Sequence, residues 1–272
     1  MLGRLLVALI FIPLFALSIT WQNTLYYNFV ISFGLVMGMV EYSGMLKKVN
    51  IKIFMALNML FLGAILLGLA QFRVPVFNAE ILYRAFTLII VYAVLLTVGS
   101  LFAGDIKDSV QKIVFSFFGV FYIVILGSSL FFVRNLGSSH TLFLFAVVWL
   151  YDGGAYFIGS RYGKTKISPN ISPKKSLEGM IGGIAVTLLL ITAFKYIKIT
   201  SGLVPFGNVG YVYFIVIILC LAAQAGDLLE SMFKRYCGVK DSSNLLLGHG
   251  GVLDKLDSFL IAAPVYLLLA VL

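Results

Sequence analysis

The chain has 272 residues, of which 61% are hydrophobic and 11% are charged, whereas a soluble domain carries about 25% charged residues. This composition excludes a soluble globular protein and indicates an all-α polytopic membrane protein. The formal net charge of +9 comes from 20 Lys and Arg against 11 Asp and Glu. In a membrane protein such an excess is typical of loops facing anionic lipid, and base-reading motifs are absent, so no nucleic-acid partner is expected. Cys220 and Cys237 have neither zinc-site nor disulfide spacing.

Hydropathy predicts roughly nine membrane-spanning helices, since a span needs about 20 mostly apolar residues. The predicted spans are residues 5–20, 25–46, 53–70, 81–103, 113–133, 142–158, 180–194, 209–229 and 259–272. The first span resembles a secretory signal, but residues 17–21 lack a small-residue cleavage site, so we expect it to be retained.

The distribution of Lys and Arg predicts the orientation of these spans. With a cytoplasmic N-terminus, fifteen Lys and Arg fall on the cytoplasmic side and five on the other. The protein is then expected in the cell inner (cytoplasmic) membrane, with both polar loops, residues 161–175 and 234–255, in the cytosol. We divide the chain into an N-terminal scaffold, residues 1–140, which could carry dimer contacts, and a catalytic region, residues 141–272.

The N-terminal half offers one acid inside a predicted span, Glu41. An intramembrane carboxylate is a functional candidate by default. However, Lys47 and Lys48 follow closely, so an interfacial ion pair with them is the favoured interpretation. We find no internal repeat of the kind that builds many transporters.

Asp152 ends an apolar run and precedes Gly153 and Gly154. A carboxylate at the edge of the bilayer is costly without a partner, which favours a functional role. The alternative is a helix-packing site, in which the glycines permit close approach and Asp152 caps a backbone. A basic loop follows directly, so we favour function.

In that loop Pro169 and Pro173 interrupt helix, and Ser176 is placed to begin a new one. Unpaired N–H groups at a helix start favour anions, so Lys174 and Lys175 beside it are predicted to bind phosphate. For Arg161, Lys164 and Lys166, attraction to anionic head groups explains the charge equally well.

Residues 225–258 form a polar stretch between two apolar runs. Asp227, Glu230 and Ser231 share one helix face, and Asp254 and Asp257 share another. An uncompensated charge inside a span costs several kcal/mol, which a bound cation would offset. A salt bridge from Asp227 to Lys234 is the competing interpretation.

Between these acids lies the turn His249-Gly250-Gly251. Successive glycines allow positive φ or close approach to a ligand. His249 is a candidate for phosphate or proton contact, although a single His is more often an ordinary hydrogen-bonding residue. Clustered carboxylates with few histidines favour Mg²⁺ or a similar hard cation.

The polar stretch resembles the signature of the phosphatidate cytidylyltransferases, and the preceding segment from Trp149 resembles that family's upstream segment. The residues that carry the resemblance are Ser231, Lys234, Arg235, Lys240, Asp241, His249, Gly250, Gly251, Asp254, Lys255 and Asp257. Two positions depart from the pattern: Lys255 stands where the family usually has Arg, and Leu247 where it usually has Pro or Gly. Lysine keeps the charge but loses the bidentate fork of arginine.

The resemblance implies a membrane-embedded enzyme that makes CDP-diacylglycerol and pyrophosphate from CTP and phosphatidate with Mg²⁺, and with a second cation where two bind. It also suggests a homodimer. Under this hypothesis Asp227 and Asp254 hold the metal, with Asp257 and Ser231 as nearby ligands. Phosphate binding is assigned to Lys174, Lys175, Ser231, Lys234, Arg235, Lys240, Gly250, Gly251 and Lys255. Asp152 and His249 would complete the catalytic group.

Two other classes are less favoured. The CDP-alcohol phosphotransferases need an Arg and later paired acids that residues 152–156 and their surroundings lack. A membrane ion or anion transporter would display its polar groups near the bilayer midplane, whereas the acids here cluster at one predicted cytoplasmic end.

Overall fold

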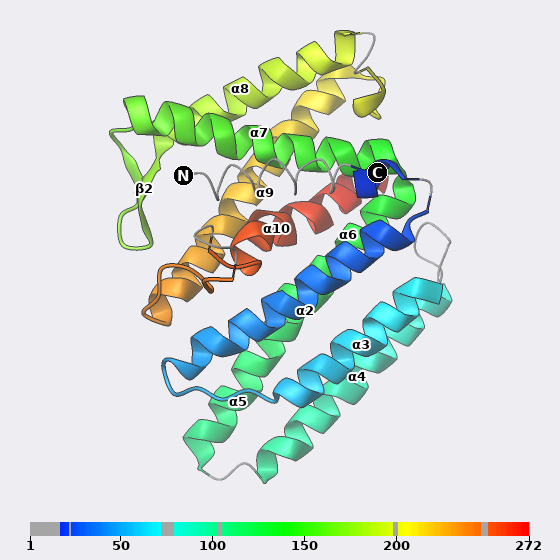
Figure 1. Ribbon diagram of the computed structural model, residues 1–272, viewed down its shortest axis with the longest axis vertical. Coiled ribbons are helices and arrows are strands. Elements are labelled where there is room, and N and C mark those ends of the chain that lie inside the picture. The colour runs from blue at the N-terminus through cyan, green and yellow to red at the C-terminus, as the bar shows by residue number, and fades with distance from the viewer. Residues whose placement is uncertain are drawn as a thin grey trace.

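The computed structural model describes residues 17–21, 23–71, 79–102, 105–197, 201–245 and 250–271. In chain order its principal elements are α2 (Leu25–Lys47), α3 (Met55–Gln71), α4 (Ala79–Leu101), α5 (Ile106–Gly119), a π-helix η1 (Val120–Ile125), α6 (Leu126–Leu136), α7 (Ser138–Tyr162), β1 (Lys166–Ser168), β2 (Ser172–Ser176), α8 (Leu177–Tyr196), a 3₁₀ turn η2 (Ser201–Leu203), α9 (Val209–Tyr236) and α10 (Leu253–Val271). Figure 1 shows these helices side by side, with α8 at one edge and α4 at the other.

Six helical segments of the described chain are long and apolar enough to cross a membrane. They are Leu25–Lys47, Tyr83–Leu101, Ile106–Leu136, Ser138–Tyr162, Leu177–Tyr196 and Val209–Tyr236. α3 is apolar but shorter, and α10 carries Asp254, Lys255 and Asp257 in its first turns. The protein is therefore an all-α, multi-pass membrane protein. Most of the predicted first span, residues 5–20, lies outside the described residues, so the count of nine and the N-terminal orientation stay predictions.

The predicted span at residues 113–133 belongs to a longer continuous helix. α5, η1 and α6 follow one another without a break over Ile106–Leu136. A π-helical turn of this kind inserts extra residues into an α-helix and changes which side chains face a neighbour. Gly119, just before the turn, accommodates the ring of Tyr42 from α2, and Gly127, just after it, accommodates Leu35.

α7 and α8 have the most extensive contact of the described helix pairs, because small residues line it. A Cβ at Gly183 would meet backbone atoms of Ala155 and Tyr151, and one at Gly179 would meet the Ala155 carbonyl. This is the small-residue packing that membrane helices use to approach closely. Ser176 caps the start of α8, as predicted, by accepting a hydrogen bond from the Gly179 N–H at 3.2 Å.

The loop that joins α7 to α8 contains a short β-hairpin that hydropathy and the two prolines did not predict. β1 and β2 pair antiparallel, with Lys166 opposite Ser176 and Ser168 opposite Ser172. Lys174 and Lys175 lie in β2. They are therefore held on a strand directly before the helix start.

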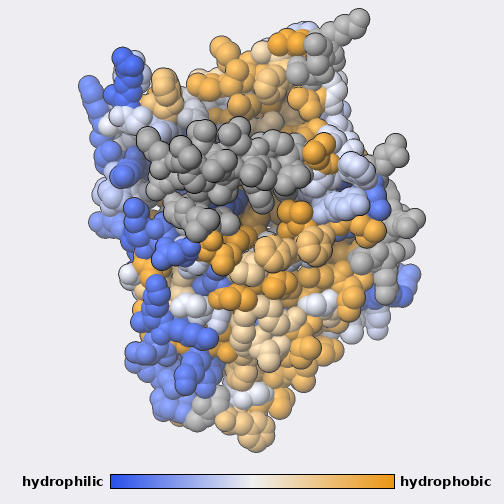
Figure 2. All heavy atoms as spheres, viewed as in Figure 1, coloured by the Kyte–Doolittle hydropathy of each residue, from blue (hydrophilic) through white to orange (hydrophobic). Residues whose placement is uncertain are grey.

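α10 lies centrally and packs against α9, α6, α2 and α7. A Cβ at Gly226 of α9 would lie 2.5 Å from the Asp257 carbonyl oxygen, so the two backbones touch at the level of the predicted acids. Figure 2 shows hydrophilic residues gathered along the edge where β2 and the C-terminal end of α9 lie, and apolar residues over much of the rest of that face. The polar ends of the helices thus form one surface of the protein.

Candidate active site

A cleft of about 710 Å³ opens between α7, the β-hairpin, α8, α9 and α10. It brings together many of the side chains singled out in the sequence. The predicted site residues that line it are Asp152, Lys174, Lys175, Asp227, Asp254 and Asp257. Lys166 of β1 also lines it, so four carboxylates from three helices share one cavity with three lysines from the hairpin.

Asp227 is paired in this cleft with Lys175 and not with Lys234, the partner in the competing interpretation. Its carboxylate forms an ion pair with the Lys175 ammonium and accepts a hydrogen bond from the Ser231 hydroxyl at 3.2 Å. The alternative partner, Lys234, instead contacts Glu230 and Asp254. Lys175 and Asp227 are both partly exposed, so the pair is open to a ligand in the cleft.

Asp257 is the most enclosed acid of the cleft, with 9% of its surface exposed. It accepts a hydrogen bond from the Ser258 N–H at 2.7 Å. Asp257 lies outside the six candidate spans. Burial, followed by the nearby charge of Asp227, raises the pKa of its carboxyl above the ordinary value. Two close carboxylates of this kind are stabilised in their ionised form by a cation.

Asp254 has four donors around it. Lys234 Nζ lies 2.6 Å from Oδ1, and Oδ2 accepts from Gly251 N at 2.6 Å and from Ser242 N and Oγ at 3.0 and 2.9 Å. Burial raises the pKa of Asp254, but the hydrogen bonds from Lys234 and from the Gly251 and Ser242 N–H groups outweigh it and lower the pKa overall. These hydrogen bonds connect Asp254 to the segment that precedes α10.

Lys234 and Glu230 lie beneath the cleft and do not line it. Lys234 is 8% exposed and bridges Glu230 on its own helix to Asp254 on α10. Glu230, which shares a helix face with Asp227 as predicted, is fully buried. A buried charge needs such partners, so this lysine joins α9 to α10.

Glu41 does not form the expected ion pair. Among the described residues its carboxylate contacts neither Lys47 nor Lys48; it accepts hydrogen bonds from Ser242, Ser243 and the backbone N–H groups of Val252 and Leu253. The expectation was wrong because it considered only neighbours in sequence. An acid in the predicted scaffold thus contacts the predicted catalytic region.

The functional role of Asp152 stays a prediction, while the close helix packing of the alternative is observed at Gly154. Asp152 lines the cleft, while Gly154 packs against Gly183 and Val186 of α8. Gly153 has open space around it. The close helix contact and the exposed acid thus belong to one turn of α7.

The remaining predicted residues that the structure describes do not line the cleft. Arg235 donates to the carbonyls of Ile171 and Val239 at 3.2 and 2.9 Å, which links α9 to the tip of the hairpin. Lys240 and Lys255 are exposed. Gly250 has a φ of +81°, the conformation that its sequence predicted, and a Cβ at Gly251 would meet Ser242 and Glu41. His249 lies outside the described residues.

Gln224 lines the cleft and was missed in the sequence. It lies three residues before Asp227, and the Tyr151 hydroxyl donates to its Oε1 at 2.7 Å. Its spacing from Asp227 within an apolar run was an available signal.

The donor set of the cleft fits a hard divalent cation, because Asp oxygens line it and the described chain places no His or Cys there. No three His, Cys, Asp or Glu side chains of the described residues are already grouped as a metal site. Lys175 holds the position beside Asp227, so cation binding requires these side chains to shift.

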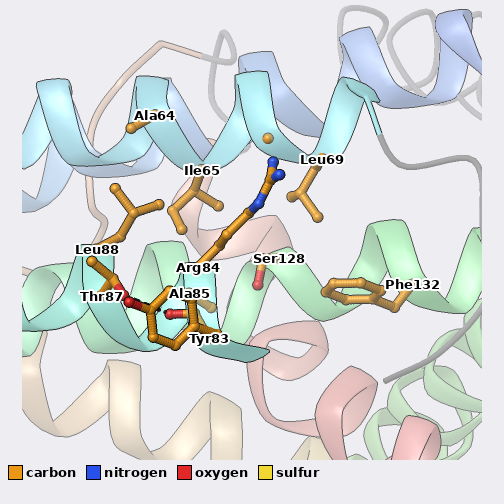
Figure 3. Close-up of a pocket in the computed structure, with 11 residues that line it drawn as sticks. Ala64, Ile65, Leu69, Tyr83, Arg84, Ala85, Thr87, Leu88, Ser128 and Phe132 are labelled. Atoms are coloured by element: carbon orange, nitrogen blue, oxygen red, sulfur yellow. Dashed lines mark hydrogen bonds between the residues drawn. The ribbon is translucent and has the colours of Figure 1, made fainter. Parts of the chain in front are cut away.

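A second cavity, of about 430 Å³, lies between α3, α4 and α6. Figure 3 shows it lined by apolar side chains, with Arg84 extending toward α3 beside Leu69. No carboxylate lines it, and Arg84 forms an ion pair with Glu80 at 2.5 Å. It therefore lacks the acid and lysine groups of the first cleft.

Fold and cleft together define a multi-pass membrane protein with a polar, acid-rich cleft. The sequence model of the Cytidylyltransferase family matches residues 2–272. The chain therefore belongs to this family, and the resemblance drawn from its motifs is confirmed at that level.

Individual relatives are similar over part of their length. The chain is 45% identical over 144 residues to a protein of Bacillus subtilis (strain 168) named phosphatidate cytidylyltransferase, with 51% of each chain covered. Proteins of the same name match from Staphylococcus aureus (strain COL), 46% identical over 48% of each chain, and Haemophilus influenzae, 46% identical over 46% of this chain and 43% of the relative. The aligned part spans about half the length of these relatives.

Proposed function

We propose that this protein transfers the cytidylyl group of CTP to phosphatidate, giving CDP-diacylglycerol and pyrophosphate. Family membership and the relatives named phosphatidate cytidylyltransferase support the reaction. The observation that carries it to this structure is the cleft in which four aspartates from α7, α9 and α10 face Lys174 and Lys175 of β2. A site of this composition suits two phosphate-bearing substrates.

The chemistry needs charge neutralisation more than proton transfer. A phosphatidate oxygen is already anionic; it attacks the α-phosphorus of CTP, the bond from that phosphorus to the β-phosphate oxygen breaks, and pyrophosphate leaves with the electron pair. Two anions must be brought together in line. In this proposal Lys174 and Lys175 bind phosphate oxygens inside the cleft, while exposed Lys240 and Lys255 attract the substrates to its entrance.

The acids of the cleft are proposed to hold Mg²⁺. If two cations bind, the same acids would hold both. When bound, the cation would neutralise phosphate charge. Asp227 and Asp257 are the first candidates, with Ser231 supporting Asp227 through its 3.2 Å hydrogen bond. Asp254 could contribute while it keeps its donors, and Asp152 faces the same cavity. When substrate arrives, Lys175 is proposed to move from Asp227 to a phosphate oxygen.

The orientation belongs to the same proposal. With roughly nine spans and a cytoplasmic N-terminus in the cell inner membrane, the β-hairpin and the cleft would face the cytosol, where CTP is found. The acyl chains of phosphatidate would stay in the bilayer. The homodimer is likewise a proposal; crosslinking in membranes would test it.

The decisive experiment measures pyrophosphate release by purified protein from CTP, with and without phosphatidate and Mg²⁺. We expect release only when all are present. Asp227→Ala should lower turnover by about 1,000-fold, at the upper end of what one charge-stabilising group contributes.

A matched control is Asp105→Ala, which removes an exposed acid before α5 and should leave turnover unchanged. Pyrophosphate release that is independent of phosphatidate would exclude the proposed reaction. Normal turnover by Asp227→Ala would remove Asp227 from the site while leaving the reaction in place.

A further inference from the structure

Glu41 lies in α2, far in sequence from the cleft, yet it is 5% exposed and surrounded by donors from the segment before α10. Its Oε1 accepts from the Ser243 hydroxyl at 2.6 Å and from Val252 N at 2.9 Å. Its Oε2 accepts from the Ser242 hydroxyl at 3.0 Å and from Leu253 N at 2.8 Å. Each oxygen thus receives one backbone and one side-chain donor.

This arrangement provides hydrogen-bond acceptors for N–H groups at the start of α10. The helix begins at Leu253, and N–H groups at a helix start have no partner within the helix. A carboxylate at that position accepts these hydrogen bonds and is favoured by the helix dipole. Usually the cap comes from the residue that precedes the helix; here it comes from another helix, 212 residues away in sequence.

The contact extends to the acids of the cleft. The Ser242 hydroxyl lies 3.0 Å from Glu41 Oε2 and 2.9 Å from Asp254 Oδ2. A Cβ at Gly251 would overlap the Ser242 hydroxyl and both carboxylate oxygens of Glu41. These groups are therefore packed without spare room. Asp257 follows Asp254 by about one helical turn, so the start of α10 sets the position of both acids.

We propose that Glu41 is a positioning residue of the active site, which holds the first turn of α10 so that Asp254 and Asp257 stay aligned with Asp227. The inference rests on the proposed function for its catalytic consequence. Glu41 does not line the cleft, so it acts through α10 and not by touching substrate. It ties the predicted scaffold to the catalytic region.

The test is Glu41→Gln, which keeps the size of the side chain. The amide has one acceptor oxygen, and its NH₂ group would face N–H donors that it cannot satisfy. Supporting groups behind a metal site typically change metal affinity or activity by about 10- to 100-fold. We expect kcat to fall within that range and the Mg²⁺ concentration for half-maximal activity to rise, with KM for CTP changed less than kcat.

The matched control is Tyr42→Phe, one position further along the same helix. Tyr42 donates a hydrogen bond to the Phe115 carbonyl at 2.8 Å, and its hydroxyl forms no hydrogen bond with the described residues 242–245 and 250–253. The variant loses this hydrogen bond without touching α10. Its Mg²⁺ dependence should match that of the wild-type protein, and the same shift in both variants would reduce Glu41 to a general contributor to stability.

Hydrogen exchange supplies a readout that does not depend on catalysis. In Glu41→Gln the amides of Val252 and Leu253 should exchange at least about tenfold faster, as expected for the loss of about 1.4 kcal/mol of protection. Tyr42→Phe should not change them. Unaltered exchange in Glu41→Gln would overturn the inference, whatever the activity.

Ser243→Ala is the second test variant, for use if Glu41→Gln does not fold. It removes one donor to Glu41 and leaves the donors of Asp254 in place, so we expect smaller changes in hydrogen exchange and Mg²⁺ dependence, in the same direction. Wild-type values of both would contradict the inference. If the wild-type protein makes no CDP-diacylglycerol, the proposed function fails, while hydrogen exchange still decides whether Glu41 holds α10.

Discussion

Four glycines at helix contacts, two in each half of the protein, face different groups. In the N-terminal half Gly119 accommodates the ring of Tyr42, and Gly127 accommodates Leu35. In the C-terminal half Gly183 and Gly226 instead face backbone, Gly183 against α7 and Gly226 against the Asp257 carbonyl of α10. The first arrangement makes room for large side chains; the second brings helix axes together.

We relate this difference in glycine contacts to the predicted division of the chain into an N-terminal scaffold and a C-terminal catalytic region. Close backbones in the C-terminal half leave little room between helices, so the polar side chains at their ends converge on one cleft. In the N-terminal half one group of buried polar side chains is paired within that half: the Tyr92 hydroxyl donates to Asn58 Oδ1 at 2.9 Å, and Asn58 donates to the Ser116 carbonyl at 3.4 Å. Glu41 differs from this group, because its partners lie in the other half.

Among the variants that test this comparison, the largest combined effect on stability and turnover is expected from Gly226→Ala. The new methyl group would overlap the Asp257 carbonyl, which is backbone and cannot rotate away, and overpacking of this kind costs about 1–3 kcal/mol. We expect turnover to fall by at least about tenfold, since displacement of a catalytic group by about 1 Å can cost about 100-fold. Pyrophosphate release and thermal unfolding would measure both consequences.

Gly44→Ala is the matched control, because nothing lies within 4 Å of that position. Alanine in place of glycine in a helix is favourable by about 0.5–1 kcal/mol, so stability should rise slightly and turnover should stay the same. Equal behaviour of the two variants would break the distinction between the two uses of glycine.

An intermediate effect is expected from Lys175→Met. This change leaves Asp227 without its ion-pair partner and removes a proposed phosphate ligand. We expect kcat/KM for CTP to fall by about 10- to 100-fold, or about 1.4–2.7 kcal/mol.

Lys174→Met sharpens that result, because Lys174 lines the same cleft and is more exposed. Its loss should be smaller, within about tenfold, as expected for a charge screened by solvent. If kcat/KM for CTP fell more in Lys174→Met than in Lys175→Met, the ion pair with Asp227 would not identify the lysine that contributes more to catalysis.

The smallest effect on catalysis is expected from Asn58→Ala. It removes a buried side chain from the N-terminal network and leaves the Tyr92 hydroxyl without its partner, which should destabilise the protein by about 1–3 kcal/mol. Turnover per folded molecule and Mg²⁺ dependence should stay within about twofold of the wild-type values. A marked change in Mg²⁺ dependence would mean that the scaffold influences the site by routes other than Glu41.

The sequence by itself determined the class of fold and most of the candidate residues. Long apolar runs specify helices because each backbone group in a membrane must be satisfied within its own segment, so eight of the predicted spans coincide with helices of the described chain. The start of α8 at Ser176 was also readable, because a helix cap is a local signal. The same holds for the positive φ at Gly250.

Only the tertiary structure decided how the charges pair. Spacing along one helix suggested Lys234 for Asp227 and lysines of its own helix end for Glu41, whereas the partners come from β2 and from the segment before α10. Local spacing predicts contacts within a helix, but a buried charge is stabilised by whichever donors the packing brings near it. Those donors lie up to 212 residues away in sequence, and no short-range pattern contains them.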